Sequence, residues 1–345
     1  MARTPAVTIK DVARRASVSI ATVSYVLNES ASISDATRAR VLAAAEELDY
    51  RPSAIARGLR AQESRIIGYS WHRLPPDRWN PIMERFLYNV AEAADAQGYH
   101  ILTFTSPPDS EPWPLYEELM LTGQVDGFIV SDTNRDDERI RHLLDSGFPF
   151  VAFGRANEEW DFPYVDVDGA EGVRQAVEHL LALGHRRIGL IAWPEASLPG
   201  YHRHQGYIAM LQAAGISSDP AWITRIEHTE ASSRQAAHTL LNLPPDRRPT
   251  AVVALSDLTA IGAMNAIYEM GLQPGRDVAV VGFDDIPAAQ YLRPPLTTLH
   301  QPIAEVGERV INMLLQIIRG EELAEREVLL SPTLIVRESS GGMVT

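Results

Sequence analysis

The stretch TIKDVARRASVSIATVSYVLN, residues 8–28, contains two short helical patterns separated by a break at residues 17–19. Thr8 followed by Asp11 resembles a capping box at the start of the first pattern. A third pattern, SDATRARVLAAAEELD, covers residues 34–49. Ser19 and Ser34 are the expected N-caps, and the apolar stripes are Ile9, Val12, Ala13 and Ala16 in the first helix and Val41, Leu42, Ala45 and Leu48 in the third. Three short helices with a tight turn between the first two are typical of a helix-turn-helix.

The second helix has two different faces. At about 100° per residue, Val23, Val26 and Leu27 lie together and are expected to pack on the other two helices. The opposite side would carry Ile20, Ala21, Ser24, Tyr25 and Asn28. One interpretation is a few stray apolar residues on a surface. The other is a recognition helix, whose apolar side chains meet thymine methyl groups and whose hydroxyls reach base edges or phosphates.

Charge separates the first 60 residues from the rest. They hold nine basic and six acidic residues, a surplus of +3, whereas the whole chain of 345 residues has a net charge of −14. A weakly basic head on an acidic body indicates that the head alone meets a polyanion. Lys10 is the only lysine, which argues against a Walker-type phosphate loop elsewhere. The absence of cysteine excludes disulfides, thiolate zinc sites and cysteine nucleophiles.

The quoted stretch, together with SISDATRARVLAAAEELDYRPSAIARGLR at residues 32–60, strongly resembles the LacI/GalR family of transcription regulators. The resemblance places Ile20, Ala21 and Tyr25 at base-reading positions. It gives the residues that steady the helix on the DNA backbone as Ser19, Thr22, Ser24 and Asn28. Many members carry arginine where Tyr25 stands. Arginine grips guanine with two hydrogen bonds whereas tyrosine offers one hydroxyl and a ring edge, so the operator is expected to differ at this base pair.

The segment RPSAIARGLR, residues 51–60, is too short and too glycine-interrupted to be a stable isolated helix. A plain linker is one interpretation. The family resemblance implies instead a hinge helix that becomes ordered when two copies meet over DNA. Leu59 would then enter the minor groove and kink the central step, and Arg60 would lie beside it near phosphates.

Beyond residue 63, apolar runs alternate with helical patterns that each end in glycine. The runs expected to be strands are residues 65–70, 100–104, 127–131, 149–154, 187–193, 251–256 and 278–283. The expected helices are residues 82–98, 138–147, 170–184, 203–215 and 257–271. Such alternation predicts parallel sheets with helices on both faces, in two lobes with a cleft at the carboxyl ends of the strands.

This body resembles the type I periplasmic-binding-protein fold that the family carries, through segments such as VVALSDLTAIGAMNAI and VVGFDDIPAAQYLRPPLTTLHQP. The expected divisions are a head at 1–50, a hinge and linker at 51–62 and an effector-binding and dimerisation domain at 63–345. The lobes would be joined by crossings near 162–165, 290–293 and 323–328. The tail ESSGGMVT lacks heptad leucines, so a homodimer on a two-fold operator is expected rather than a tetramer.

The family resemblance also implies an effector site. Arg203 would grip hydroxyls or a carboxylate of the effector, and Asp284 would contact it beside this arginine, an arrangement that suits the vicinal hydroxyls of a sugar. Arg155, just after another strand, and Met83, on the pocket wall, are further candidates for contact with the effector. The alternatives are a surface ion pair for Arg203, a lobe-closing salt bridge for Arg155 and a core position for Met83. His228 and Ser256 are weaker candidates by approximate alignment. Three tryptophans are candidates for stacking on a sugar ring, namely Trp79, Trp160 and Trp193, although Trp193 could equally belong to the core.

Two departures from the family pattern bear on the effector. Gly169 replaces the asparagine common after Asp168, and Ile82 and Met83 replace aromatic residues that would stack on a purine. We therefore expect the effector to be a carbohydrate rather than a purine.

An enzyme and a sugar-binding module without DNA binding are the rival interpretations. His185 and the Asp284–Asp285 pair are the residues from which catalysis could be assembled, but GxSxG, HExxH, Walker and GxGxxG patterns are all absent. We therefore expect a dimeric repressor that needs no cofactor or metal and that a small-molecule effector releases from DNA. Corepression by a purine or another metabolite is the alternative. No apolar run is long enough to span a membrane and the N-terminus lacks a signal-peptide core, so a cytoplasmic location is expected.

Overall fold

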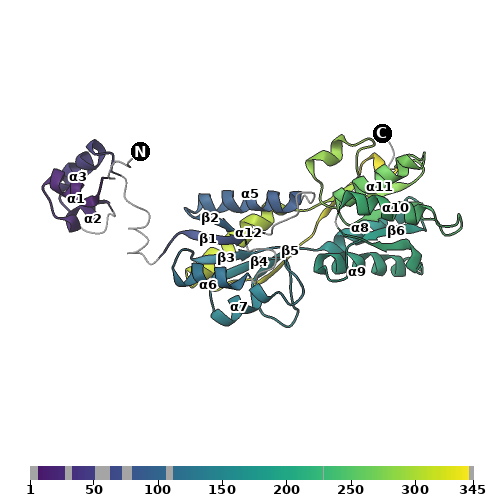
Figure 1. Ribbon diagram of the computed structural model, residues 1–345, viewed down its shortest axis with the longest axis horizontal. Coiled ribbons are helices and arrows are strands. Elements are labelled where there is room, and N and C mark those ends of the chain that lie inside the picture. The colour runs from purple at the N-terminus through teal and green to yellow at the C-terminus, as the bar shows by residue number, and fades with distance from the viewer. Residues whose placement is uncertain are drawn as a thin grey trace. The chain divides into compact units, whose positions relative to one another are not determined.

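A computed structural model describes residues 7–27, 33–50, 63–71, 80–105, 112–227 and 229–341. The chain divides into two compact units, residues 1–65 and 66–345 (Figure 1). The expected hinge at 51–62 lies outside the described residues.

The first unit holds three helices, α1 (Ile9–Ala16), α2 (Ile20–Leu27) and α3 (Asp35–Glu47). The capping box at the start of α1 is confirmed, because the Asp11 carboxylate accepts hydrogen bonds from the Thr8 amide at 2.9 Å and the Thr8 hydroxyl at 2.6 Å. The core of the unit consists of Val12, Ala13, Ala16, Val23, Val26, Val41, Ala44 and Ala45.

The apolar stripe expected along α3 is wrong at one position, because Leu42 is 48% exposed and Ala44 is buried instead. Ser34 is the N-cap residue of the helix as expected, although its hydroxyl donates to Thr37 Oγ1 at 3.0 Å and, within the described residues, accepts no hydrogen bond from a helix amide.

The first lobe of the second unit is a six-stranded parallel sheet in the order β11-β5-β4-β3-β1-β2. Its strands are β1 (Ile66–Ser70), β2 (His100–Phe104), β3 (Gly127–Val130), β4 (Phe150–Phe153), β5 (Tyr164–Val167) and β11 (Glu327–Leu330). Helices α5 (Pro81–Ala96) and α12 (Ile303–Ile318) pack on one face of the sheet, and α6 (Trp113–Leu121) and α7 (Glu138–Ser146) pack on the other. Each face of the sheet has its own hydrophobic core, and successive strand residues alternate between them, as Phe128 and Ile129 do.

The second lobe is a four-stranded parallel sheet in the order β7-β6-β8-β9. Its strands are β6 (Ile188–Ala192), β7 (Ile223–Arg225), β8 (Ala251–Ala254) and β9 (Ala279–Val281). Helices α8 (Gly169–Ala182) and α9 (Leu198–Ala213) share one core with it, and α10 (Glu230–Leu241) and α11 (Asp257–Glu269) share the other. An antiparallel pair, β10 (Thr298–His300) and β12 (Thr333–Ile335), completes this lobe.

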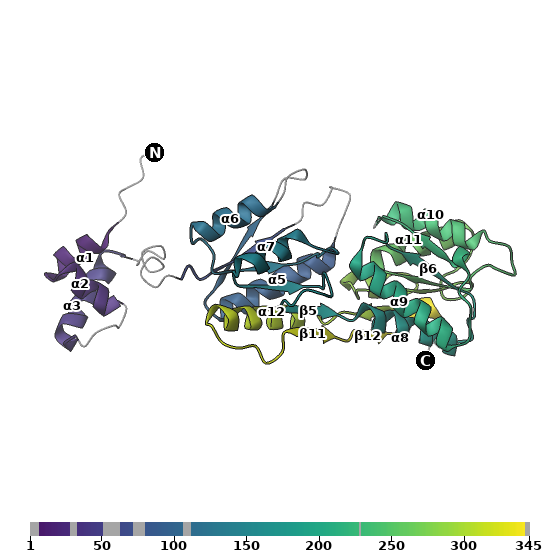
Figure 2. The ribbon, with the colours of Figure 1, turned by 90° about the horizontal axis from the view of Figure 1, so that it is seen from below.

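The chain passes between the lobes at residue 168, at residues 301–302 and at residues 331–332, along the edge where Figure 2 shows β5, β11 and β12. Each predicted crossing lies too early in the sequence. Residues 164–167 form β5 of the first lobe, residues 290–293 overlap a short helical turn (Pro287–Tyr291) on the core of the second lobe, and Glu327–Leu330 form β11 beside β5.

The seven strands and five helices expected beyond residue 63 are all present, and the glycines expected at the ends of these helices have φ between 64° and 93°. This left-handed conformation favours glycine and ends a helix. Helices α6, α10 and α12 were not expected, and α9 begins five residues earlier than predicted.

Candidate functional site

Helix α2 presents an apolar outer face. Ile20 is 41% exposed and Tyr25 is 47% exposed, and Ala21 between them is also exposed. Ser19 caps the helix as expected, because its Oγ accepts a hydrogen bond from the Thr22 amide at 3.0 Å. Exposed apolar side chains on a helix that is otherwise anchored in a small core can contact thymine methyl groups in the major groove.

The expectation that Ser24 points outward is wrong. Its side chain is buried, with 6% exposed, whereas Val23 and Val26 are buried as predicted. On the helical wheel Ser24 lies about 60° from Leu27, which places it at the border of the buried arc rather than opposite it. The other expected DNA contacts, Asn28, Leu59 and Arg60, lie outside the described residues.

A cavity of about 500 Å³ lies between the two lobes of the second unit. Its walls come from the ends of β3, β4, β5 and β6 and from Asp284 after β9, so it occupies the carboxyl edges of both sheets. Five candidate residues line it, namely Met83, Arg155, Trp193, Arg203 and Asp284. Trp160 packs in the core of the first lobe instead, and Trp79 and His228 lie outside the described residues.

Arg203, in the middle of α9, is a buried cation and not the exposed partner of a surface ion pair. Only 7% of the residue is exposed. Its guanidinium carbon lies 3.7 Å from the ring centroid of Phe283 and 4.8 Å from that of Trp193. Its Nη1 donates to the Leu255 carbonyl, and its Nε has no hydrogen-bond partner among the residues that the structure describes. The guanidinium is thus fixed by two rings and one carbonyl.

Gly169 makes room for this arginine. A Cβ at position 169 would lie 2.8 Å from Arg203 Cγ, closer than carbon atoms pack. The departure from the asparagine common at this position therefore has a steric reason in this chain.

Asp284 follows β9 and is also buried, with 6% exposed. Its Oδ1 accepts a hydrogen bond from Gln301 Nε2 at 2.7 Å. Burial raises the pKa of its carboxyl to about 8, although the nearby Arg203 charge opposes the shift; the Asp257 carboxylate adds to it. Near neutral pH the carboxyl therefore carries a proton in much of the population, and it can donate as well as accept a hydrogen bond.

Arg155 forms an ion pair inside the first lobe. Its Nε lies 2.7 Å from Oδ2 of Asp166, and its carbonyl accepts a hydrogen bond from Thr133 Oγ1 at 2.6 Å. Burial raises the pKa of Asp166, against the effect of the arginine beside it. Because Arg155 and Asp166 both belong to the first lobe, the pair does not close one lobe on the other.

Met83 serves both of the roles considered for it, since it lines the cavity and packs against the core beneath α5. Ser256 is fully buried and does not line the cavity. Its Oγ accepts from the Thr259 amide at 3.2 Å, and Thr259 Oγ1 accepts from the Ser256 amide at 3.0 Å. It caps α11, which is a structural role.

Further residues around the cavity were not predicted from the sequence. They include Asp132, Thr133, Asn134, Asp166, Ser197, His202, Glu227 and Gln301. Burial and the Arg155 charge lower the pKa of His202 to about 4, so its imidazole is neutral near pH 7. Its Nε2 is buried and, within the described residues, has no hydrogen-bond partner. The sequence signal for Asp132–Asn134 was their place directly after a strand.

No group of three or more histidine, aspartate or glutamate side chains among the described residues is arranged to hold a metal ion. Within the same ranges, no helix has the length and apolar character to cross a membrane.

A helix-turn-helix with an outward recognition face, followed by a two-lobed body with a polar cavity at its strand ends, defines a DNA-binding regulator with a small-molecule-binding body. Two family models match the chain, one described as bacterial regulatory proteins of the lacI family at residues 8–53 and one described as a periplasmic binding protein-like domain at residues 177–340. The chain belongs to the lacI family of bacterial regulatory proteins, and it is a transcriptional regulator.

Similarity to known members extends over nearly the whole chain. The transcriptional repressor CytR of Escherichia coli strain K12 is 34% identical over 97% of this chain and 96% of its own length. A structure of the transcriptional regulator CelR with cellobiose has a TM-score of 0.73 at 33% identity, over 96% of this chain and 99% of that one. The lac repressor dimer bound to operator and the anti-inducer ONPF has a TM-score of 0.86 at 29% identity, over 97% and 99%.

Proposed function

We propose that this regulator is a homodimeric repressor that reads a palindromic operator through α2 and is released from it by a neutral carbohydrate bound in the interlobe cavity. The observation that carries the effector class is that a ring-stacked Arg203 and the buried Asp284 line the same cavity. The cavity volume of about 500 Å³ is in the range of small-molecule sites and accommodates a mono- or disaccharide.

The charges around the cavity favour a neutral ligand. Its acidic lining residues are Asp132, Asp166, Glu227 and Asp284, and its basic ones are Arg155 and Arg203. Arg155 is paired with Asp166, and Arg203 is held by two rings and a carbonyl. A phosphorylated or carboxylated effector would therefore meet more acidic than basic residues in this lining, whereas sugar hydroxyls can donate to carboxylates and accept from Arg203 Nε and His202.

A thermal-shift screen of the full protein tests the effector class. At a concentration of about 100 times its Kd, a bound sugar stabilises the folded state by about 2.7 kcal/mol and raises Tm by several degrees. We expect a neutral sugar, with cellobiose among those screened, to raise Tm and its phosphorylated derivative to have no effect. A response to purine bases alone would contradict the proposal.

The DNA-reading role rests on the exposed face of α2. We expect Tyr25→Ala to weaken binding to a DNA duplex selected by the protein, since the exposed ring would no longer contact a base. Tyr88→Ala is the matched control, because Tyr88 is a tyrosine 66% exposed on α5 of the body. An equal affinity of the two variants for DNA would count against α2 as the recognition helix.

We also infer that the body binds its ligand without transforming it. Among the residues considered for catalysis, His185 lies outside the cavity lining, where its Nδ1 is 2.9 Å from Thr250 Oγ1. Incubating the pure protein with candidate glycosides tests this inference, and turnover would overturn it.

A further inference from the structure

The residue pair after β9 has an unusual backbone. Asp284 and Asp285 have φ of 130° and 49°, both in the left-handed region that favours glycine. Non-glycine residues stay in this region only where their surroundings hold them there, and such positions cluster at functional sites. The two side chains also have different roles, because Asp284 lines the cavity and Asp285 does not.

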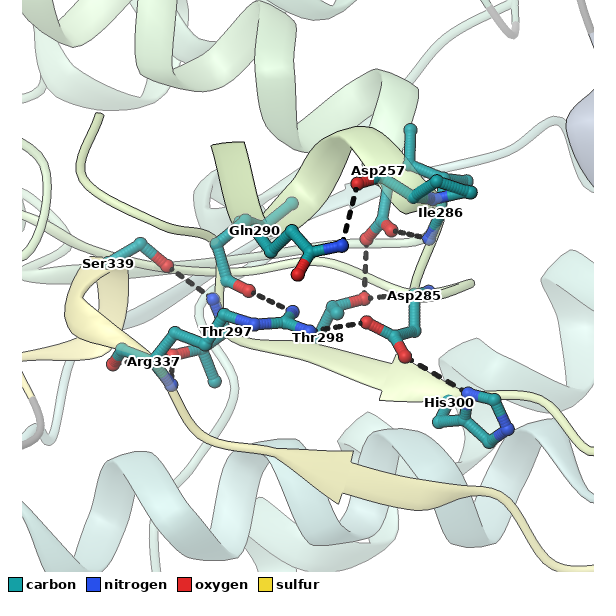
Figure 3. Close-up of polar contacts among 11 residues, drawn as sticks. Asp257, Asp285, Ile286, Gln290, Thr297, Thr298, His300, Arg337 and Ser339 are labelled. Carbon is teal, nitrogen blue, oxygen red and sulfur yellow. Dashed lines mark hydrogen bonds and ion pairs between the residues drawn. The ribbon is translucent and has the colours of Figure 1, made fainter. Parts of the chain in front are cut away.

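Three successive amides anchor this turn. The Asp284 amide donates to the Leu299 carbonyl at 2.8 Å, and the Asp285 amide donates to Thr298 Oγ1 at 3.3 Å. The Ile286 amide donates to Oδ2 of Asp257 at 2.8 Å, as Figure 3 shows. Two of these anchors lie in β10, the strand that leads into the second crossing between the lobes.

The Asp285 carboxylate lies between two basic side chains from separate segments (Figure 3). Its Oδ2 is 3.0 Å from His300 Nδ1, and its Oδ1 accepts a hydrogen bond from Arg337 Nη2 at 2.8 Å. About 20% of the Arg337 and Asp285 side chains is exposed, so the pair is shielded more than a surface ion pair. We call Asp285, His300 and Arg337 the Asp285 clamp.

Arg337 is also held by two further hydrogen bonds. Its Nη1 donates to the Leu296 carbonyl at 2.7 Å, and its backbone amide donates to Thr297 Oγ1 at 2.8 Å. The guanidinium therefore spans from the segment before β10 to the Asp285 carboxylate, which makes it a fixed bridge rather than a mobile surface group.

The clamp joins two segments that adjoin two of the three crossings. His300 is the last residue of β10, directly before the crossing at residues 301–302, and Gln301 in that crossing donates to Asp284. Arg337 follows β12, the strand that begins directly after the crossing at residues 331–332. One turn is thus joined to the cavity through Asp284, and to the end of β10 and the segment after β12 through the clamp.

We propose that His300 and Arg337, acting through Asp285, are positioning residues that hold Asp284 toward the cavity and link its contact with effector to the second and third crossings. The part concerning effector rests on the proposed function. A ligand that pulls on Asp284 would move the turn, and the clamp would pass this displacement to the two segments on which the lobes move relative to each other.

Hydrogen exchange in the full protein tests the clamp without a ligand. We expect Arg337→Gln and Asp285→Asn each to speed exchange at the amides of residues 284–286 by about tenfold, the effect of losing one charge-assisted hydrogen bond. The double variant should exchange no faster than Asp285→Asn alone, because that substitution already removes the interaction that Arg337→Gln removes. Arg337→Lys keeps the charge and should restore most of the protection.

The matched control is Arg326→Gln, which removes a surface ion pair between Arg326 Nε and Asp161 at 2.9 Å directly before β11. It should exchange as the wild type does at residues 284–286. Unchanged exchange there in a folded Arg337→Gln, or additive effects in the double variant, would overturn the clamp. If Arg337→Gln does not fold, the same exchange measurement on His300→Asn and Arg337→Lys decides. Faster exchange at residues 284–286 in His300→Asn, with most of the protection kept in Arg337→Lys, supports the clamp, and wild-type exchange in His300→Asn overturns it.

Calorimetric titration with cellobiose separates this proposal from the proposed function. We expect Arg337→Gln to weaken cellobiose binding by about tenfold and Arg326→Gln to leave it unchanged. If the wild type does not bind cellobiose while exchange at 284–286 responds as described, the carbohydrate class loses support and the clamp stands. If cellobiose binds equally well to the wild type and to Arg337→Gln, the clamp fails and the carbohydrate function stands.

Discussion

Asp284→Asn should change how the stability of the protein depends on pH. The ordinary pKa of an aspartate is 3.8, and burial raises that of Asp284 to about 8. Between these values the folded state retains a proton that the unfolded state has lost. The free energy of unfolding of the wild type therefore falls as pH rises through this window, by up to about 1.4 kcal/mol per pH unit. Asparagine is isosteric and does not titrate, so the variant lacks this contribution.

The window from pH 7.0 to 8.5 isolates the effect. Burial also raises the pKa of Asp257, to about 6, so about nine-tenths of that carboxyl is already ionised at the start of this window. Over 1.5 pH units the wild type should lose between about 1 and 2 kcal/mol relative to Asp284→Asn. Urea unfolding at both pH values, followed by the fluorescence of the body, measures this difference. Parallel pH dependence of the two proteins would refute a buried, protonated Asp284.

Three further substitutions test particular residues. Tyr25→Arg should shift the operator preference toward guanine at one base pair of each half-site by about 1–3 kcal/mol, measured by selection from a random DNA pool, and an unchanged preference would contradict base reading by this residue. Gly169→Ala should displace Arg203, because the added Cβ would lie 2.8 Å from Arg203 Cγ, and it should lower the free energy of unfolding by about 1–3 kcal/mol. Calorimetry should show sugar affinity lowered by about tenfold or more, and an unchanged affinity would show that Arg203 can shift freely. Ser256→Ala should destabilise the protein by about 1 kcal/mol in urea unfolding and leave sugar affinity unchanged, because Ser256 caps α11 outside the cavity lining, and a selective loss of sugar binding would contradict that placement.

The parallel sheets were predictable because their strands are buried on both faces and read as continuous apolar runs, as Gly127–Val130 does. Strand β5 escaped prediction because its sequence, YVDV, alternates, and Asp166 turns toward the cavity. The start of α9 was missed because Pro199 and Gly200 lie in its first turn, where proline is tolerated. By contrast, the apolar period of α12 at Val306, Val310 and Leu314 was a readable signal.

The candidate site was predictable where one residue carries the chemistry, as with Arg203 and Asp284, and not where the site depends on the approach of two lobes. His202 and Asp132 reach one cavity from different lobes, and no local pattern records their proximity. Ser24 was misplaced for a related reason. A residue at the border of the buried arc of a helix is exposed or buried according to what packs beside it, and here it is buried.

The affinity of the full protein for its selected operator, measured by fluorescence anisotropy with and without a saturating neutral sugar, decides whether the cavity governs DNA binding. Release by effector predicts that the sugar weakens operator binding by about 5- to 150-fold and that operator DNA weakens sugar binding by the same factor. Equal operator affinity in the two conditions, or tighter binding with the sugar, would contradict a repressor that a carbohydrate releases.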